Sequence, residues 1–523
     1  MTSGFTALVE PLGDALDPTE ACARFLDLPY LVFLDSATAH PYRPIHSSAN
    51  GPRAEAQQLE QYSFLAADPV LVVRSKGSIT EVRQRDDTVW VPVQGDALSV
   101  ARSRLPAVPV QPVPGLPPFQ GGLAGYIGYD WGAVLERLPA ARYDDLSIPD
   151  VILGLYDWVI AWDHRIGASW LISTGLPETG AARERQARER MGLVRERLGG
   201  RTGGRADGRT KQDERPARLS PSPLAPPTYP VLGIDGAREI GLTSTFTHRG
   251  YLDAVGRVRE YIIAGDIFQA NLSQRFQSPL AEPPFQLYLR LRGHNPAPFA
   301  AYLGFDELAV LSASPERFLR LDDQQRMVET RPIKGTRPRG LGPMHDAALG
   351  RALSESAKDR AENVMIVDLL RNDLSRVCRA GTVRVPELFA LEQHPTVHHL
   401  VSTVIGELAP GASAVDLIRA AFPGGSITGA PKVRAMEIIA ELEPTQRGVY
   451  CGSIGYISAT GAMDTSIVIR TYLAIRGQVY FQAGGGIVAD SDVELEYRET
   501  LDKARGLIET LVDSQVTSRQ SPA

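Results

Sequence analysis

The stretch DIFQANLSQRF, residues 266–276, decides the fold class, because apolar and polar side chains alternate along it. A period of two places the two kinds of side chain on opposite faces of a β-strand. We therefore expect a strand here, with a polar face that could line a site. The apolar face carries Phe268, Ala270, Leu272 and Phe276, and the polar face carries Gln269, Asn271, Ser273 and Arg275.

The sequence on either side of this strand mixes helical and extended patterns. Apolar residues recur at helical spacing from Leu252 to Ile262, and Gly265 is expected to end that helix. The rest of the C-terminal half alternates strands with amphipathic helices. The first 180 residues instead contain short β-rich runs, such as YLVFLDSA and DPVLVVRSKG, separated by turns.

Composition changes sharply between these two halves. We expect an N-terminal β-rich lobe over residues 1–180, an Arg/Gly/Pro-rich linker over 181–240, and a second domain over 241–515. The linker begins with a helix-forming, arginine-rich segment and continues without periodicity. Its basic charge could indicate nucleic-acid binding, but no aromatic residue is interleaved before Tyr229, so a solvated tether is the better interpretation.

Charge, cysteines and histidines exclude several classes of protein. The formal net charge of −6 combines 55 basic and 61 acidic residues, so no overall field attracts nucleic acid or an anionic membrane. Cys22, Cys378 and Cys451 are too far apart in sequence for a cysteine zinc site, and adjacent His398 and His399 face opposite sides of a predicted strand. Without an apolar run near the roughly 20 residues of a membrane helix, or a leader segment, a cytoplasmic enzyme is expected.

Two predicted helices carry paired carboxylates. Asp359 and Glu362 lie three residues apart before an apolar turn, and a capping box at residues 491–494 begins a helix that places Glu496 and Glu499 one turn apart. If these helix ends approach each other, a hard cation such as Mg²⁺ would neutralise the carboxylates. The alternative is that these are solvated helix faces.

Lys334 lies in RPIKGTRPRG, where Pro332 and Gly335 predict an irregular turn. The surrounding arginines would lower the pKa of the lysine and make its neutral amine available as a nucleophile. The alternative is a plain anion-binding loop. The arginines are Arg331, Arg337 and Arg339.

Two glycine-rich stretches resemble nucleotide-binding motifs only in part. GGSITGAPK, residues 424–432, lacks the Gly-Lys-Ser/Thr of a phosphate loop. Gly484, Gly486 and Ala489 match G-x-G-x-x-A, which keeps an NAD-dependent dehydrogenase as a rival, although no second strand with an acidic ribose partner follows. Consecutive glycines are better explained as exposed backbone N–H groups that hold a carboxylate.

Taken together, these segments resemble the chorismate-utilising enzymes. DIFQANLSQRF, SPERF, RPIKGTRPRG, KDRAENVMIVDLLRND, VHHLVS, GSITGAPK, YCGSIGY, SIVIRTY, AGGGIVADSD and EYRETLDKA follow the family's order across residues 247–512. The resemblance implies an α+β fold with a large two-layered antiparallel β-sheet core and helices outside, with residues 241–515 as the catalytic domain. The substrate is expected in a cleft between lobes.

The resemblance also implies roles for individual residues. It is closest to the aminodeoxychorismate synthase branch, because relatives that add water usually carry a lysine in place of Gln269, and anthranilate synthases usually have PIAGT instead of PIKGT. Lys334 is similar to a nucleophile that attacks C2 of chorismate, and Glu316 to the general acid at the 4-hydroxyl. The other implied roles are Mg²⁺ binding by Glu362 and Glu499 with Glu496 nearby, enolpyruvyl binding by Tyr450, Arg470, Gly484, Gly485 and Gly486, and ring-side contacts from His399, Ser426 and Lys432.

Partners follow from the same resemblance. The chain has no cysteine in a Gly-x-Cys-x-Gly setting, so ammonia is expected from a separate glutamine amidotransferase subunit. Asp35 and Ser36, with Asn295 and Pro296, are similar to a tryptophan pocket of relatives, with aspartate in place of the usual glutamate. An anthranilate synthase large subunit and a silent chorismate- or tryptophan-binding regulatory subunit are the alternatives.

Overall fold

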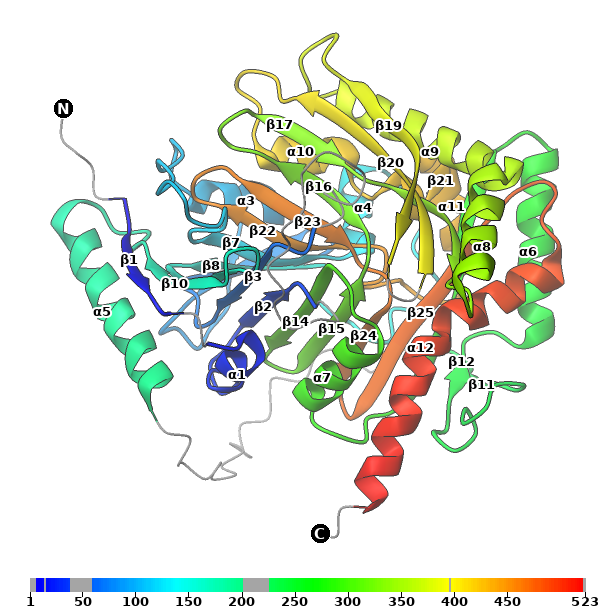
Figure 1. Cartoon of the computed structure of the whole chain (residues 1–523), viewed down its shortest axis with the longest axis horizontal. Coiled ribbons are helices and arrows are strands. Elements are labelled where there is room, and N and C mark those ends of the chain that lie inside the picture. The colour runs from blue at the N-terminus through cyan, green and yellow to red at the C-terminus, as the bar shows by residue number, and fades with distance from the viewer. Residues whose placement is uncertain (1–5, 14–15, 38–58, 201–224, 395–396, 521–523) are drawn as a thin grey trace.

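The computed structural model describes residues 6–13, 16–37, 59–200, 225–394 and 397–520 (Figure 1). Within them, two large antiparallel sheets form the centre of the molecule and helices cover their outer sides. This confirms the predicted α+β class and the two-layered antiparallel core. The described residues contain no helix that is both long enough and apolar enough to cross a membrane.

The first sheet has thirteen strands. In spatial order they are β1 (Leu8–Pro11), β10 (Ala168–Ser173), β9 (Trp158–Asp163), β3 (Tyr62–Ala66), β2 (Leu31–Asp35), β14 (Phe299–Phe305), β15 (Leu308–Ser314), β24 (Thr471–Ile475), β25 (Gln478–Ile487), β13 (Gln269–Pro279), β12 (Thr243–Ser244) and β11 (Tyr229–Pro230), with β21 (Gly429–Ala430) paired to β13.

The second sheet has twelve strands. In spatial order they are β18 (Ile333–Pro338), β20 (Val397–Glu407), β17 (Met327–Thr330), β16 (Arg317–Leu321), β23 (Met463–Ile467), β22 (Ser453–Ser458), β7 (Gly122–Ile127), β8 (Val151–Tyr156), β4 (Leu71–Lys76), β5 (Ile79–Gln84) and β6 (Val91–Val93), with β19 (Arg384–Gln393) paired to β20.

Both halves of the chain contribute strands to both sheets. The segment 1–180 supplies one side of each sheet and the segment 241–515 supplies the other, joined through the β2–β14 and β7–β22 pairs. The two segments are therefore parts of one body, and β13 lies in a sheet that the N-terminal segment completes.

The helices lie mainly on the outer faces of the sheets. They are α1 (Pro18–Ala23), α3 (Ala97–Arg104), α4 (Gly132–Leu135), α5 (Gly180–Gly199), α6 (His248–Ile263), α7 (Pro284–His294), α8 (Pro343–Glu355), α9 (Ala357–Ser375), α10 (Ala414–Ala421), α11 (Lys432–Leu442) and α12 (Val493–Gln520), with two 3₁₀ turns, η1 (Tyr129–Trp131) and η2 (Gly425–Ile427).

An aromatic core holds the two sheets together. Phe64 of the first sheet lies 5.3 Å from the ring of Tyr456 in the second, and Phe119 stacks on Tyr456 at 4.7 Å. All three side chains are at most 6% exposed. Full burial of a large apolar side chain contributes roughly 1.5–3 kcal/mol each, so this layer fixes the distance between the sheets.

The two predicted helices at the ends of the catalytic segment are present, with one change in capping. The helix expected from Leu252 to Ile262 is α6, and Gly265 follows it with φ of +85°. At the head of α12, Asp492 accepts the backbone N–H of Glu494, which the predicted capping box assigns to Ser491, and also that of Leu495. The Ser491 hydroxyl instead donates to Glu496 at 2.6 Å, because the strand–helix turn brings it over that carboxylate.

The beginning of the predicted linker is folded. α5 lies against β1 and β10, and Arg190 is buried between Asp68 at 2.9 Å and Asp157 at 3.4 Å. Residues 225–240 return to the first sheet through β11. The remainder of the predicted linker, residues 201–224, lies outside the described residues.

Candidate active site

The predicted catalytic strand β13 pairs with the glycine-rich end of β25, with residues 484–486 opposite residues 271–273. The Gln269 amide lies so close to Gly486 that any side chain there would collide with it, and its buried carbonyl oxygen has no partner in the described chain. β24 pairs with β25 only as far as Phe481. Open backbone groups beside an orphaned acceptor are typical of a ligand site.

Lys334 extends from β18 toward this region. Its Nζ donates to the carbonyl oxygen of Ser426 at 2.8 Å, and no ion pair reaches it among the described residues. Burial lowers the pKa of the Lys334 amine, and the more distant carboxylates of Glu362 and Glu316 offset only part of that effect. A lysine held by a carbonyl rather than a carboxylate can lose its proton more easily.

The arginines around Lys334 do not act as predicted. Each guanidinium is neutralised by a carboxylate of a neighbouring element, and burial is the main reason for the lowered pKa of the lysine. The predicted direction is therefore confirmed and the predicted cause is wrong. The arginines serve instead to fasten the loop. The pairs are Arg331 with Glu392, Arg337 with Asp359 at 2.8 Å, and Arg339 with Asp346 at 2.6 Å.

Glu316 lies in the turn between β15 and β16 and is 5% exposed. Burial raises the pKa of its carboxyl, although a hydrogen bond with the Ser426 side chain and the charge of Lys334 oppose the change. Ser426 thus contacts both groups, Lys334 through its carbonyl and Glu316 through its hydroxyl. A buried carboxylic acid beside an amine of lowered pKa is suited to acid catalysis with a nitrogen nucleophile.

Three carboxylates border the site from α9 and α12. A carbon added to Gly485 would lie 3.0 Å from Oε1 of Glu499 and 3.2 Å from Oε2 of Glu496. Burial raises the pKa of the Glu362 and Glu496 carboxyls. Burial acts in the same direction on Glu499, but Lys503, Lys358 and Lys334 together outweigh it and lower the pKa of that carboxyl.

This donor set fits a hard divalent cation. No group of three His, Cys, Asp or Glu side chains forms a complete metal cage in the described ranges, but Mg²⁺ needs only one or two protein carboxylates. The present counter-charges are Lys503, 2.7 Å from Glu499, and Lys358, 3.7 Å from Glu496. Both lysines are about half exposed, so their flexible side chains can yield to a cation.

A second group of predicted site residues consists of His399, Arg470 and Tyr450. His399 on β20 is 2% exposed, its Nδ1 lies 2.9 Å from the Thr336 hydroxyl, and burial followed by Arg470 lowers the pKa of the imidazole well below its usual range. Arg470 has φ of +51° and, in the part of the chain described, no partner for its guanidinium. Tyr450 is 7% exposed, and burial raises its pKa well above the usual range. An unpaired arginine of this kind fits a carboxylate.

Two predicted features lie outside this arrangement. The Lys432 ammonium is engaged by Asp373 at 2.7 Å and by the Ala421 carbonyl at 2.8 Å, so it fastens α11 to α9 instead of facing the site. Gly484 and Gly486 lie inside a strand rather than in a strand-to-helix turn. The dinucleotide-binding alternative is therefore wrong.

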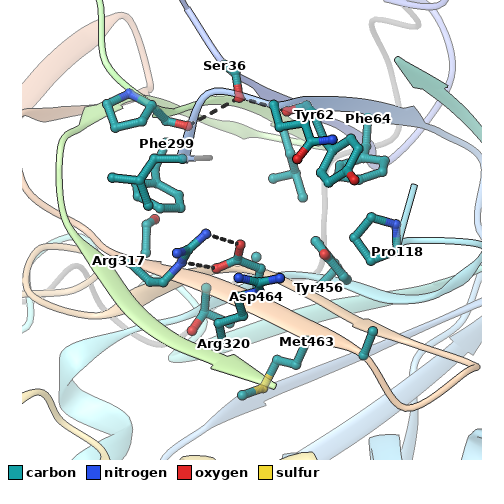
Figure 2. A pocket seen from close by; sticks show the side chains of 18 of the residues that line it. Ser36, Tyr62, Phe64, Pro118, Phe299, Arg317, Arg320, Tyr456, Met463 and Asp464 are labelled. Atoms are coloured by element: carbon teal, nitrogen blue, oxygen red, sulfur yellow. Dashed lines mark hydrogen bonds and ion pairs between the residues drawn. The ribbon is translucent and has the colours of Figure 1, made fainter. Parts of the chain in front are cut away.

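A cavity of about 270 Å³ lies between the sheets and is lined by none of Glu362, Glu496 and Glu499 (Figure 2). Asp35 and Ser36 line it, as predicted, but Asn295 and Pro296 do not, and Pro298 and Phe299 take their place. The Asn295 amide instead donates to Gly506 on α12 at 3.3 Å. The Asp35 carboxylate is already held by Arg292, by the Tyr288 hydroxyl at 3.0 Å and by Ser63 at 3.2 Å.

Sequence reasoning missed several residues that touch the site. Lys503 could have been found, because it follows Glu499 by four residues on a helix, the spacing of a supporting ion pair. Glu443 and Arg447 have the same spacing, but nothing in the sequence indicates that they are buried together behind the site.

Comparisons with known proteins identify the family of the chain. The family described as chorismate binding enzyme matches residues 54–509. The chain is 43% identical over 488 residues to aminodeoxychorismate synthase component 1 of Salmonella typhimurium, covering 92% of this chain and 93% of that protein. It is 43% identical over 418 residues to anthranilate synthase component 1 of Streptomyces coelicolor, covering 80% and 78%.

A solved structure shows the same fold. Anthranilate synthase component I from Streptococcus pneumoniae superposes with a TM-score of 0.69 at 29% identity, covering 90% of this chain and all of that one. With the family match over most of the chain and relatives above 40% identity, the chain belongs to the chorismate binding enzymes.

Proposed function

We propose that this protein is component 1 of an aminodeoxychorismate synthase, a cytoplasmic enzyme of folate and p-aminobenzoate synthesis. It replaces the 4-hydroxyl of chorismate with an amino group and retains the enolpyruvyl group. The single observation that carries the proposal is the half-buried Lys334, free of any ion pair within the described chain and bridged by Ser426 to Glu316. Four relatives of this name, 39–43% identical over 85–94% of the chain, support it.

In this proposal Lys334 and Glu316 divide the chemistry. The neutral Lys334 amine bonds to C2 while both ring double bonds shift and the 4-hydroxyl, protonated by Glu316, leaves as water. Ammonia then bonds to C4, the double bonds return, and the bond between C2 and Lys334 breaks. The new ammonium group returns one proton to Glu316, so the product leaves as an amine and both Lys334 and Glu316 are restored.

The remaining residues orient the substrate. Arg470 and Tyr450, with the open backbone of residues 484–486, bind the enolpyruvyl carboxylate, and His399 and Ser426 lie along the ring. Gln269 occupies the position at which water-adding relatives carry a base, so no protein group there activates water. Glu362 and Glu499, with Glu496 beside them, would hold Mg²⁺. When bound, Mg²⁺ neutralises the ring carboxylate.

Ammonia is expected from a separate glutamine amidotransferase subunit. Cys22, Cys378 and Cys451 are all buried, and burial raises the pKa of each thiol, so none is suited to attack glutamine.

Product analysis tests the proposal. The purified chain with chorismate, Mg²⁺ and an ammonium salt should form 4-amino-4-deoxychorismate, detected by liquid chromatography and mass spectrometry, and should form none when glutamine replaces ammonium. Release of anthranilate would assign the chain to the anthranilate synthases instead. Turnover with glutamine alone would contradict the need for a partner subunit.

Tryptophan is a proposed ligand of the cavity in Figure 2. Tyr62, Phe64, Phe299 and Tyr456 give it aromatic walls that suit an indole ring. Isothermal titration with tryptophan tests this, with Ser36→Phe as the blocking variant. Equal binding by both proteins would place the ligand elsewhere.

A further inference from the structure

A buried ion pair lies directly behind the chorismate site. Arg447 and Glu443 are 3% and 4% exposed, and Arg447 binds the two carboxylate oxygens at 2.8 and 2.6 Å. Removing two charges from water costs several kcal/mol per ion, and the mutual attraction recovers this only when further hydrogen bonds complete the arrangement. The remaining partners of the pair therefore indicate its purpose.

Most of those partners belong to the segments that carry the site, and the exception is the Tyr129 ring on η1, 4.5 Å from the guanidinium. Arg447 donates to the carbonyl of Asn271 at 2.6 Å and to that of Ile427 at 3.1 Å. Asn271 is two residues after Gln269 on β13, and Ile427 follows Ser426. The guanidinium also lies 5.8 Å from the ring of Tyr450. One planar group thus touches three segments whose other residues face the substrate.

Glu443 completes the connection to β13. Its Oε1 accepts both the backbone N–H of Ser273 at 2.8 Å and the Ser273 hydroxyl at 2.9 Å. β13 is therefore held by the carboxylate through Ser273 and by the guanidinium through Asn271. A lysine could not reproduce these contacts, because an ammonium lacks the fixed fork of donors.

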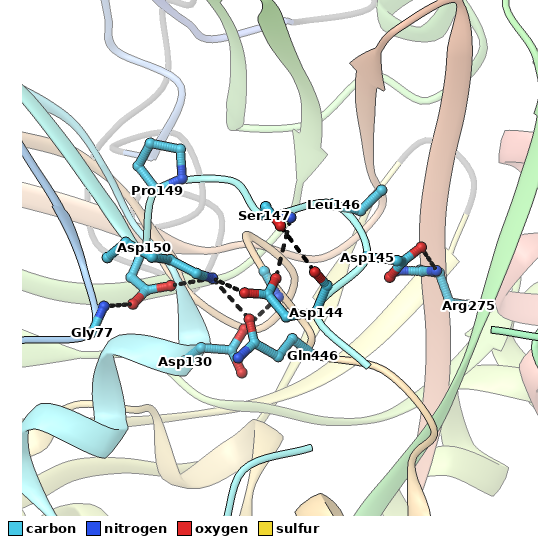
Figure 3. Close-up of polar contacts among 12 residues, drawn as sticks. Gly77, Asp130, Asp144, Asp145, Leu146, Ser147, Pro149, Asp150, Arg275 and Gln446 are labelled. Atoms are coloured by element: carbon cyan, nitrogen blue, oxygen red, sulfur yellow. Dashed lines mark hydrogen bonds and ion pairs between the residues drawn. The ribbon is translucent and has the colours of Figure 1, made fainter. Parts of the chain in front are cut away.

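The N-terminal half clamps the turn that carries the pair (Figure 3). Lys76 donates to the Gln446 side chain at 2.8 Å, and Asp130 accepts the backbone N–H of Gly448 at 2.7 Å. Tyr143 forms a bridge with Thr445. Residues on both sides of Arg447 are fixed from outside, so the guanidinium has a defined place from which to hold the site.

We propose that the Glu443–Arg447 pair is a positioning device that fixes β13, the Ser426 turn and Tyr450 relative to one another in the geometry that chorismate requires. The pair touches no substrate atom and acts only through the residues that do. Its kinetic consequences rest on the function proposed above, whereas its effect on chorismate binding rests only on membership of the family.

Arg275 offers a matched control, because it lies on β13, the strand that the Glu443–Arg447 pair holds. It is also 3% exposed and makes a bidentate pair, with Asp145 at 2.9 and 2.6 Å, but that pair fastens β13 to the loop before β8 (Figure 3). Arg447→Lys and Arg275→Lys each keep the positive charge and lose the bidentate donors of the guanidinium. They should lower the thermal midpoint by similar amounts.

The experiment measures kcat and KM with ammonium, and chorismate affinity by isothermal titration, for the wild type and both variants. Arg447→Lys should lower kcat/KM by about tenfold or more and weaken chorismate binding, because small misplacements of binding groups have effects of this size. Arg275→Lys should stay within about twofold of the wild type. Equal kinetic and binding losses in the two variants would overturn the proposal.

Two further outcomes keep the test decisive. If Arg447→Lys does not fold, Ser273→Ala removes only one hydrogen bond to Glu443, and a weaker affinity for chorismate supports the proposal while an unchanged one overturns it. If the wild type binds chorismate but makes no aminodeoxychorismate, the function is wrong, and the affinities of the variants still decide the role of the pair.

Discussion

The cluster around Lys334 and the cluster around Lys76 contain the same kinds of groups and differ in how they are paired. Lys76 lies 3.0 Å from both Asp144 and Asp150, and these carboxylates outweigh burial and raise the pKa of its amine. Lys334 is held by a carbonyl oxygen, and burial lowers its pKa. Paired charges therefore support the structure in Figure 3, whereas imperfectly paired ones are available for chemistry.

The largest expected effect tests this contrast on the two lysines. Lys334→Arg keeps the positive charge but removes the proposed nucleophile, so C4 amination should fall on the order of 10³-fold or more. Lys76→Arg should stay within about threefold of the wild type, because its role is an ion pair. Steady-state assays with ammonium measure both rates, and equal losses would remove the distinction between the clusters.

Glu316 should give the next largest effect. Glu316→Gln keeps the shape but cannot protonate the leaving hydroxyl, so kcat should fall about 10²–10⁴-fold. Because burial raises the pKa of Glu316, the acid form persists to higher pH, and wild-type kcat/KM should decline as pH rises through that raised pKa. Asp150→Asn in the Lys76 cluster should lower stability without moving this limb of the pH profile. A wild-type limb that persists in Glu316→Gln would assign it to another group.

The carboxylates of α9 and α12 should show a smaller effect that depends on Mg²⁺. Glu362→Gln and Glu499→Gln should raise the Mg²⁺ concentration for half-maximal activity about 10–100-fold, because each removes a proposed ligand. Glu494→Gln is the matched control, since Glu494 is on the same helix as Glu499 and pairs with His248 at 3.0 Å. Identical Mg²⁺ titrations for all four proteins would contradict the metal assignment.

Much of the fold could be predicted because its elements are strongly patterned. The alternation in β13 and the apolar spacing of α6 identified both elements, and the family resemblance supplied the two-layered sheets. The predicted division into an N-terminal lobe and a C-terminal domain could not show that both contribute strands to each sheet. Strand pairing joins residues hundreds of positions apart, such as Leu34 and Ala301. Local pattern carries no information about such partners.

The candidate site divides in the same way. Lys334, Glu316 and Glu362 were predicted to belong to the site, and the fold brings them near one another. The cause of the lowered Lys334 pKa was not, because sequence neighbours such as Arg337 are neutralised by residues from other elements. Burial depends on what the fold places around a group, and composition near it in sequence is a poor guide to that.

A substitution of Asp130, at the edge of the Lys76 cluster, should have the smallest effect on activity. It tests whether a carboxyl beside that cluster is paired or unpaired. Burial raises its pKa to about 7, opposed by the hydrogen bond from Gly448 and assisted by Asp150. The folded state thus binds this proton more tightly than the unfolded chain. The stability that the protonated group contributes is fully present below about pH 4 and is lost as pH rises to about 7.

Asp130→Asn removes this titration while its amide oxygen can still accept the Gly448 N–H. The free energy of unfolding of the variant, relative to the wild type, should therefore increase by about 2–3 kcal/mol between pH 5 and pH 8. Urea unfolding at several pH values measures it, and kcat should change little because Asp130 reaches the site only through the 444–448 turn. A difference that stays constant with pH would mean that Asp130 is charged in the folded protein throughout, paired like Asp150 with Lys76. Asp130 would then count among the paired groups of the Lys76 cluster, and the turn that holds the Glu443–Arg447 pair would contain no unpaired carboxyl of this kind.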